Sequence, residues 1–404
     1  MELPNAKKNK GLRRINSMNK MRPVLMQLQH FISTFHFQKA VDEHNADKNV
    51  RSFSTWNLLT VMIYTHFTHK KSLRDICTGL QSLTRRWYHL GLVSLSRNNL
   101  SNSLAKRPAE VFEKTFYMLL DSVQGTMTGM TDKRFRFKNP IKAIDSTTLS
   151  LCISLYAWAS FRKTKAGIKV HTVYDIKNQI PDFICITDAL CHDHTAVPQI
   201  PIQAGALYAL DRGYFCLKTL ENINKNQAFF VTRLKSKTLY SVVSKTKPKG
   251  NGILADQSIV FTGIKSHHYP GAVRLVRYRD TDGKIYHFIT NNYDLSAATI
   301  AAVYKARWDI ELFFKWVKQN LRLKTFIGTS ENAVRIQIWT AAITYLLVEY
   351  IRFVSRTTFS KIDVFRILGS ELMNDRAVTS LFEKQKPISR HLRSTFDLQL
   401  DLCF

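Results

Sequence analysis

The sequence predicts an α/β protein in which a mixed-sheet core is interrupted by a β-rich insertion and preceded by an all-helical region. Three observations predict this class. Apolar residues recur at three- and four-residue spacing from Val24 to about Val123, which indicates helices. Residues 141–234 contain five strand patterns with a helical pattern after the fourth, an arrangement typical of a mixed sheet. Residues 235–294 contain strand patterns only, and helices resume near Ser296.

The chain begins with a basic stretch. Residues 1–22 carry seven Lys and Arg side chains against the single acidic Glu2. This composition predicts a flexible arm that can follow DNA phosphates, and a solvated tail without a partner fits equally well.

Two short helices are predicted at Ser72–Leu83 and Ser96–Arg107 within the helical region. The second is rich in Asn, Ser, Arg and Lys, which are residue types that reach base edges and phosphates. The pair resembles a helix-turn-helix DNA reader, and a helical bundle with a polar face is the alternative. The segment Gly125–Pro140 is basic and is predicted to be a linker.

The strands of the core are predicted from runs of apolar residues or alternating residues. The last two flank a helical pattern that begins near Phe215. The predicted strands are Ile141–Asp145, Ile168–Asp175, Ile180–Thr187, Ala206–Asp211 and Ala228–Leu234. In the insertion, two strand patterns flank the turn sequence Asp280–Gly283, which predicts a β-hairpin.

The overall composition bounds the class of protein. Lys and Arg number 59 against 30 Asp and Glu, and this net charge of +29 favours a polyanionic partner, with nucleic acid first. The six cysteines are scattered without a C-x-x-C pair, which is typical of a reduced, cytoplasmic protein. No signal peptide or basic amphipathic helix is recognised, and the apolar run Ile336–Ile351 is too short and too polar to span a bilayer. We therefore expect a cytoplasmic, nucleoid-associated protein with no membrane partner.

The stretch Tyr304–Lys318 is predicted to form one buried helix with a single polar stripe. At about 100° per residue, Tyr304, Arg307, Glu311 and Lys318 fall on one face, while large apolar residues occupy most of the remaining surface. A buried polar stripe requires polar partners. An Arg307–Glu311 surface ion pair at i,i+4 spacing is the simpler interpretation.

Two aspartates supply the expected partners because each closes an apolar strand. Asp145 ends the first strand pattern and Asp211 ends the fourth. Sites in α/β sheets are built where strands end. Asp145, Asp211 and Glu311 would form a set of three carboxylates, which repel one another unless a cation compensates. Oxygen ligands of this kind suit two Mg²⁺ ions, with Mn²⁺ as a substitute.

These motifs resemble the DDE transposases of bacterial insertion sequences, in the insertion-sequence-four group. The similarity is carried by A-I-D-S-T-T-L around Asp145, A-L-D-R-G-Y around Asp211, and the signature Y-x2-R-x3-E-x6-K, which begins at Tyr304 and ends at Lys318. It extends from about residue 23 to about residue 345.

The resemblance implies a ribonuclease H-like core in which the three carboxylates are catalytic and bind two metal ions. It also implies that Tyr304, Arg307 and Lys318 bind DNA phosphates. Double-stranded DNA would be bound at the terminal inverted repeats and at the target, its 3′ ends would be transferred, and the protein would act as a homodimer on DNA. Arg212, which directly follows Asp211, is a further candidate for contact with a phosphate. Lys169 and His171 alternate on the second strand and are candidates for the border of the site.

Two rival functions remain at this point: a metal-dependent nuclease with the same core, and a catalytically inactive DNA-binding regulator. The expected organisation is a basic arm (1–22), a helical DNA-binding region (23–135), the core in two parts (136–234 and 296–350), the insertion (235–295) and a C-terminal region (351–404).

Overall fold

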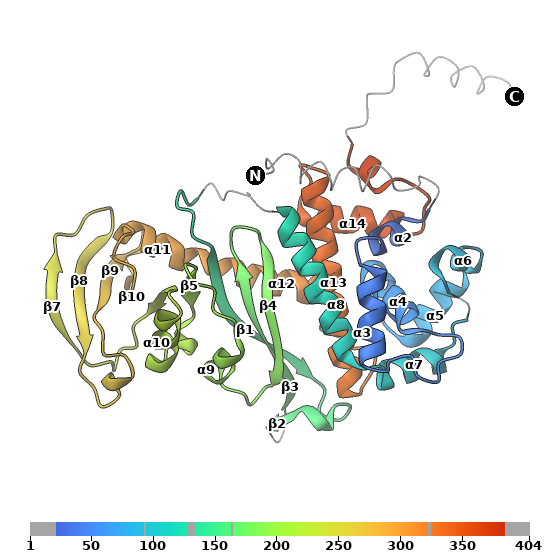
Figure 1. Cartoon of the computed structure of the whole chain (residues 1–404), viewed down its shortest axis with the longest axis horizontal. Coiled ribbons are helices and arrows are strands. Elements are labelled where there is room, and N and C mark those ends of the chain that lie inside the picture. Colours follow the sequence, from blue (N-terminus) through green and yellow to red (C-terminus); the bar gives the residue numbers. More distant parts are fainter. Residues whose placement is uncertain are drawn as a thin grey trace, which may run out of the picture.

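The computed structural model describes residues 22–383 except 93, 128–133, 163, 164, 322 and 324. The predicted basic arm therefore lies almost wholly outside the described residues, as does the end of the C-terminal region. A helical bundle, a central sheet with its covering helices, and a β extension follow one another along the longest axis (Figure 1).

The helical bundle combines the N-terminal helices with the last helices of the chain. The long α13, most of whose residues are buried, packs against α4, α7, α8 and α14. Backbone hydrogen bonds join Val24 and Leu25 to the segment after α14, at Asn374 and Leu372. The bundle helices are α2 (Val24–Gln29), α3 (Thr34–Glu43), α4 (Thr55–Thr68), α5 (Leu73–Gln81), α6 (Trp87–Leu90), α7 (Arg97–Lys106), α8 (Ala109–Met127), α13 (Glu331–Val354) and α14 (Lys361–Glu371), with 3-10 turns η1 (Thr84–Arg86) and η6 (Val378–Phe382).

Serine side chains begin several of these helices because a hydroxyl oxygen can accept a free N–H of the first turn. Ser54 and Asn57 form a capping box at the start of α4. Ser72 and Ser96 begin the two helices that the sequence pairs as a DNA reader. These helices, α5 and α7, do contact each other, but η1 and α6 lie between them in the chain, so no short turn joins them.

The core sheet has the strand order β4-β3-β1-β5-β6, with β2 also paired to β3. β1, β5 and β6 are parallel, and β3 runs antiparallel between β1 and β4. This is the order of a ribonuclease H-like sheet, and the fold class expected from the sequence is confirmed. The core strands are β1 (Ile141–Leu151), β2 (Ser160–Arg162), β3 (Lys165–Asp175), β4 (Ile180–Asp188), β5 (Leu207–Leu210) and β6 (Phe229–Arg233).

The first strand is longer than predicted. The sequence ends it at Asp145, but β1 continues to Leu151 because β3 pairs with it along its whole second half, as far as the pair Leu151–Ala166. The expectation that Asp145 closes a strand is therefore wrong, and Asp145 lies in the middle of β1.

The β-rich insertion extends the core sheet. β10 pairs antiparallel with β6, and β9, β8 and β7 follow in order (Figure 1). The predicted hairpin is present: the carboxylate of Asp280 accepts the N–H groups of Asp282 and Lys284, and Gly283 takes the positive φ that the turn requires. The strands are β7 (Tyr240–Thr246), β8 (Ile253–Phe261), β9 (Val273–Arg279) and β10 (Ile285–Thr290), with η5 (Ser266–His268) between β8 and β9.

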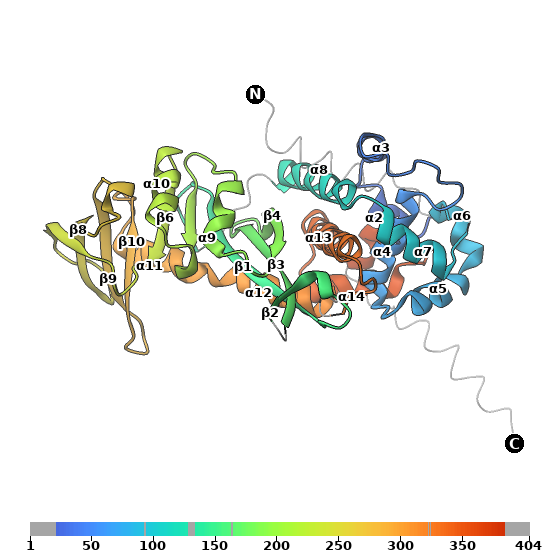
Figure 2. The same ribbon diagram turned by 90° about the horizontal axis from the view of Figure 1, so that it is seen from below.

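Helices cover both faces of the sheet. α10 (Leu217–Lys225) contacts β6 from one side, and α11 (Ala297–Ala306) and α12 (Trp308–Asn320) run along the other (Figure 2). Arg307 interrupts the helix and separates α11 from α12. The single helix predicted over Tyr304–Lys318 is therefore wrong: Tyr304 belongs to α11, whereas Glu311 and Lys318 belong to α12.

The helix α12 is fixed by aromatic contacts with its neighbours. The ring of Phe313 stacks on Tyr174 of β3 at 5.2 Å between centroids, and it meets the edge of Tyr345 of α13 at 4.9 Å. Trp316 also contacts Tyr345 at 5.3 Å. These contacts hold α12 against the sheet, where it also packs on β1. Within the described part of the chain, no helix is long and apolar enough to cross a membrane.

Candidate active site

The three predicted carboxylates lie together, although up to 166 residues separate them. Asp145 is on β1, and Asp211 directly follows β5. Because the parallel pairing sets Ile144 beside Leu210, the two aspartates are the next residues of neighbouring strands. Glu311 is in the first turn of α12, which packs on β1.

Arg307 lies at the centre of this group. Its guanidinium donates to Asp145 Oδ2 and to Glu311 Oε1, each at 2.8 Å, and lies 3.8 Å from Asp211 Oδ1. Only 7% of the residue is exposed. One cation therefore contacts all three carboxylates, which places them within the reach of a single guanidinium group. The i,i+4 pair between Arg307 and Glu311 exists, but as part of this group and not as an isolated surface pair.

The electrostatics of the group follow from burial and from the close approach of negative charges. Burial raises the pKa of Asp145 to about 6, with a smaller contribution from the charges of Asp211 and Glu311, while the N–H of Ser146 and the Arg307 guanidinium oppose this shift. Burial by itself lowers the pKa of Arg307, yet Asp145 and the other nearby acidic groups leave it above its ordinary value.

The donor set fits a divalent cation because carboxylate oxygens are the preferred ligands of Mg²⁺ and Mn²⁺. Among the described residues, no three His, Cys, Asp or Glu side chains stand in a geometry that already suits a metal ion. At this site the Arg307 guanidinium supplies the compensating positive charge. A metal ion held by these same oxygens would have to replace the guanidinium that now contacts them.

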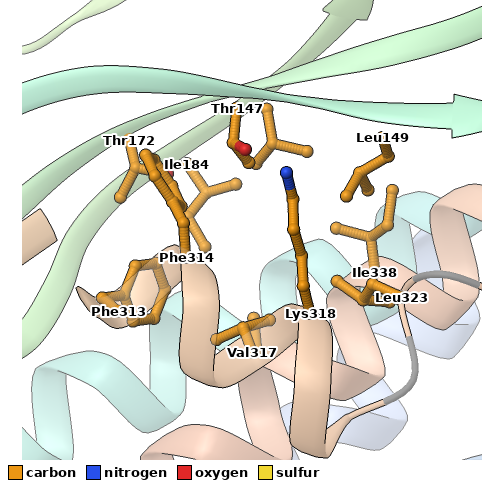
Figure 3. Close-up of a pocket in the computed structure, with 12 residues that line it drawn as sticks. Thr147, Leu149, Thr172, Ile184, Phe313, Phe314, Val317, Lys318, Leu323 and Ile338 are labelled. Atoms are coloured by element: carbon orange, nitrogen blue, oxygen red, sulfur yellow. The ribbon is translucent and has the colours of Figure 1, made fainter. Parts of the chain in front are cut away.

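An open cleft of about 430 Å³ lies beside the carboxylates. Lys318, half-buried, borders it and donates from Nζ to the carbonyl of Thr148 at 3.0 Å. Figure 3 shows the Lys318 side chain rising from α12 toward the strand that carries Thr147, among the side chains that line a small apolar cavity of about 30 Å³. The cleft is lined by Asp145, Ser146, Thr147, Glu311, Phe314, Lys315, Lys318 and Gln319.

Tyr304 borders the carboxylate group next to Arg233 of β6, and Arg212 directly follows Asp211 in the chain. The buried Tyr304 ring lies between two guanidinium groups, those of Arg233 and Arg307, each 5.8 Å from its centroid. Arg212 is exposed, and its guanidinium approaches the Ser236 hydroxyl at 3.5 Å.

Lys169 and His171 lie on β3, but their side chains point to the face of the sheet opposite to Asp145, because Asp145 pairs with Thr172 whereas His171 pairs with Ser146. The environments of the two side chains differ. Lys169 Nζ donates to the carbonyl of Cys191 at 2.6 Å. His171 is fully buried, with ring nitrogens 3.1 Å from the Tyr214 hydroxyl and 3.0 Å from that of Thr187. Burial lowers the pKa of His171 to about 4. His171 therefore belongs to the buried interior of the protein and has no surface open to DNA.

Two charged residues at this site are absent from the sequence-based set. Arg233 ends β6, the parallel neighbour of β5, so it lies at the same sheet edge as Asp211. The strand–helix–strand pattern of residues 206–234 is the signal that could have placed it there. Asp193 lies between β4 and β5, and its carboxylate accepts the hydroxyl of Ser146 at 2.7 Å. Local sequence gives no sign of this contact.

The family described as Transposase DDE domain matches residues 136–347, which include all three carboxylates and Arg307. A domain of unknown function matches residues 20–93.

Proteins named as transposases are similar in sequence to this chain. The protein assigned as transposase y4zB of Sinorhizobium fredii is 32% identical over 304 residues, which cover 74% of this chain and 83% of the relative. The protein assigned as the transposase for insertion sequence element IS5377 of Geobacillus stearothermophilus is 30% identical over 256 residues, covering 62% and 67%. A synaptic complex of piggyBac transposase with hairpin DNA aligns at 8% identity and a TM-score of 0.45, over 93% of this chain and 85% of that one. By its sequence match over more than half of its length, the chain belongs to the Transposase DDE domain family, together with transposases of bacterial insertion sequences.

Proposed function

We propose that this protein is the transposase of an insertion sequence of the insertion-sequence-four group. In this proposal it binds the terminal inverted repeats, cleaves the DNA there and transfers the 3′ ends to target DNA. The observation that carries the proposal is the contact of one guanidinium with Asp145, Asp211 and Glu311, three carboxylates that come from separate segments of the chain. Family membership supports the same reaction class.

Asp145, Asp211 and Glu311 would hold two Mg²⁺ ions, with Mn²⁺ as a substitute. When bound, such ions stabilise the attacking and leaving oxygens of a phosphodiester. The protein's own part is to keep the three carboxylates ionised and aligned. Burial raises the pKa of Asp145 to about 6, so at neutral pH this carboxyl is mostly ionised and available as a ligand.

The cationic side chains at the cleft would bind DNA phosphates. Arg307, Lys318 and Arg212 come from three different elements around the carboxylates, and Tyr304 is adjacent. Arg suits a bidentate contact with a phosphate, and Lys acts as a compact point charge. When Arg307 leaves the carboxylates, its guanidinium can contact a phosphate beside them, so arrival of metal and DNA would change its partner.

The helical bundle would recognise the ends of the element. The outer face of α7 exposes Arg97, Asn98, Asn102 and Lys106, which can donate to phosphates and base edges. The net charge of +29 supplies long-range attraction to duplex DNA. Joining two ends to one target requires two active sites, which favours a homodimer on DNA.

The experiment uses the full chain, Mg²⁺ and a DNA fragment that carries one end of the element. We expect nicking at the end and joined products, and we expect loss of both with Asp145→Ala or Glu311→Ala. Glu331→Ala is the matched control because Glu331 also pairs with an arginine four residues away, but at the exposed start of α13. Nicking without joining would identify a nuclease, and binding without nicking would identify an inactive regulator.

A further inference from the structure

A fourth carboxylate, that of Asp193, lies next to the immediate chain neighbours of two of the three that define the site. It is on the short helix α9 (Asp193–Ala196), in the connection between β4 and β5. Its Oδ1 accepts the Ser146 hydroxyl at 2.7 Å and lies 3.3 Å from Lys169 Nζ. Because Ser146 directly follows Asp145 on β1, this contact fastens the connection to the strand beside a candidate ligand.

The second oxygen of Asp193 lies against the turn that holds Asp211. A Cβ atom added to Gly213 would be 3.0 Å from Asp193 Oδ2, which is a tight contact, so a larger residue here would push the Asp193 carboxylate aside. The N–H of Gly213 in turn donates to Asp211 Oδ2 at 2.9 Å. One carboxylate therefore lies against both the strand that carries Asp145 and the turn that follows Asp211.

Lys169 holds Asp193 in place and balances its charge. Its ammonium group donates both to Asp193 and to the backbone carbonyl of Cys191, two residues before it. The Lys169 side chain is 15% exposed and that of Asp193 is 31% exposed, so the pair is partly shielded from solvent. With its Oδ1 engaged by Lys169 and Ser146 and its Oδ2 against Gly213, Asp193 is placed to orient neighbouring groups.

We propose that Asp193 is a positioning residue that sets the relative placement of Asp145 and Asp211 through Ser146 and Gly213. The proposal rests on the proposed function, because it requires that these aspartates bind divalent ions. Residues that orient metal ligands typically change metal affinity by about 10–100-fold when they are removed. Asp193 acts through its neighbours and does not itself touch metal or DNA.

The test measures Mn²⁺ binding by the full chain without DNA, by calorimetry and by the electron paramagnetic resonance signal of free Mn²⁺. We expect Asp193→Ala to weaken Mn²⁺ affinity at least about 10-fold. Asp193→Asn should weaken it less, because an amide oxygen can still accept the Ser146 hydroxyl. Ser146→Ala should also weaken Mn²⁺ binding. The double variant Ser146→Ala/Asp193→Ala should bind Mn²⁺ no more weakly than Asp193→Ala alone, because both changes remove the same hydrogen bond. Asp121→Ala, exposed on α8, is the control that should bind Mn²⁺ as wild type does.

Thermal unfolding without metal shows which variants fold, and the isosteric Asp193→Asn keeps the test valid if Asp193→Ala does not fold. Unchanged Mn²⁺ affinity in a folded Asp193→Asn and a folded Asp193→Ala overturns the positioning role. A different result, wild-type Mn²⁺ affinity in Asp145→Asn, would instead refute the metal site of the proposed function. The two proposals therefore fail on different variants.

Discussion

Replacement of Arg307 by Ala should destabilise the metal-free protein and strengthen its response to metal. The guanidinium makes two charged hydrogen bonds of 2.8 Å, to Asp145 and Glu311, and a third contact of 3.8 Å to Asp211. Hydrogen bonds to charged groups contribute about 1.5–3 kcal/mol each. The side chains of Glu311 and Asp211 are 34% and 32% exposed, which reduces this value through solvent screening. We expect a loss of about 3 kcal/mol, at the lower end of what removal of a buried ion partner costs.

The assay is thermal unfolding of wild type and Arg307→Ala across a Mg²⁺ series that starts in chelator. A loss of about 3 kcal/mol lowers the Tm by about 6–12 °C for a domain of about 200 residues. Added Mg²⁺ should raise the Tm of the variant more than that of wild type, because no guanidinium competes for the carboxylates. Saturation to 100 times the Kd contributes about 2.7 kcal/mol, so most of the deficit should disappear.

Arg335→Ala is the matched control. It removes an i,i+4 pair of the same 2.8 Å length, with Glu331 on the exposed face of α13. Its loss should be about 0.3–0.5 kcal/mol and independent of Mg²⁺. Equal Tm values for wild type and Arg307→Ala in chelator, or equal shifts on adding Mg²⁺, would refute the idea that Arg307 compensates the carboxylates in the absence of metal.

Three further predictions concern charged groups elsewhere in the site and the fold. Burial raises the pKa of Asp145 to about 6, so the contribution of Asp145 to the stability of the metal-free protein is complete below pH 4 and is lost as the pH rises through 6. Asp145→Asn should abolish this decline of Tm with pH, and an unchanged dependence of Tm on pH would contradict the prediction. Burial lowers the pKa of His66 to about 4, so the contribution of neutral His66 to stability is present above pH 6.5 and is lost as the pH falls through 4. His66→Gln should reduce the fall of Tm at acidic pH, whereas a Tm curve parallel to that of wild type would contradict a neutral His66. Lys361→Met removes one of two cations paired with the fully buried Glu349 and should cost about 3 kcal/mol in urea unfolding. Adding Glu349→Gln should recover part of that loss, and a double variant less stable than Lys361→Met would disprove the explanation.

Much of the core could be predicted from the sequence because its strands are short apolar runs with clear ends. The parallel neighbours β1 and β5 are both marked by buried residues before an Asp, and their pairing brings Asp145 and Asp211 together. The continuation of β1 could not be predicted. The polar residues after Asp145 suggest a turn, and it is the pairing with β3 that keeps them extended.

The site contained two features that no local pattern carries. The first is the break between α11 and α12 at Arg307, a position that holds neither Gly nor Pro. The guanidinium of Arg307 contacts Asp145 and Asp211, which come from distant segments of the chain. Asp193 meets Ser146 and Lys169 across 47 and 24 residues of chain. Helical periodicity and motif spacing describe neighbours along the chain, so contacts of this kind become visible only when the sheet is assembled.

The chain leaves the core sheet after β6 and returns to it as β10, its immediate neighbour (Figure 1). Departure and return therefore occupy adjacent positions, and everything between them is added beyond the last core strand. An insertion joined in this way can lengthen, shorten or be exchanged for another β module while β1, β5 and α12 keep their places. The arrangement gives evolution, and protein engineering, a position at which the β extension can be altered without moving the strands and the helix that carry the three carboxylates.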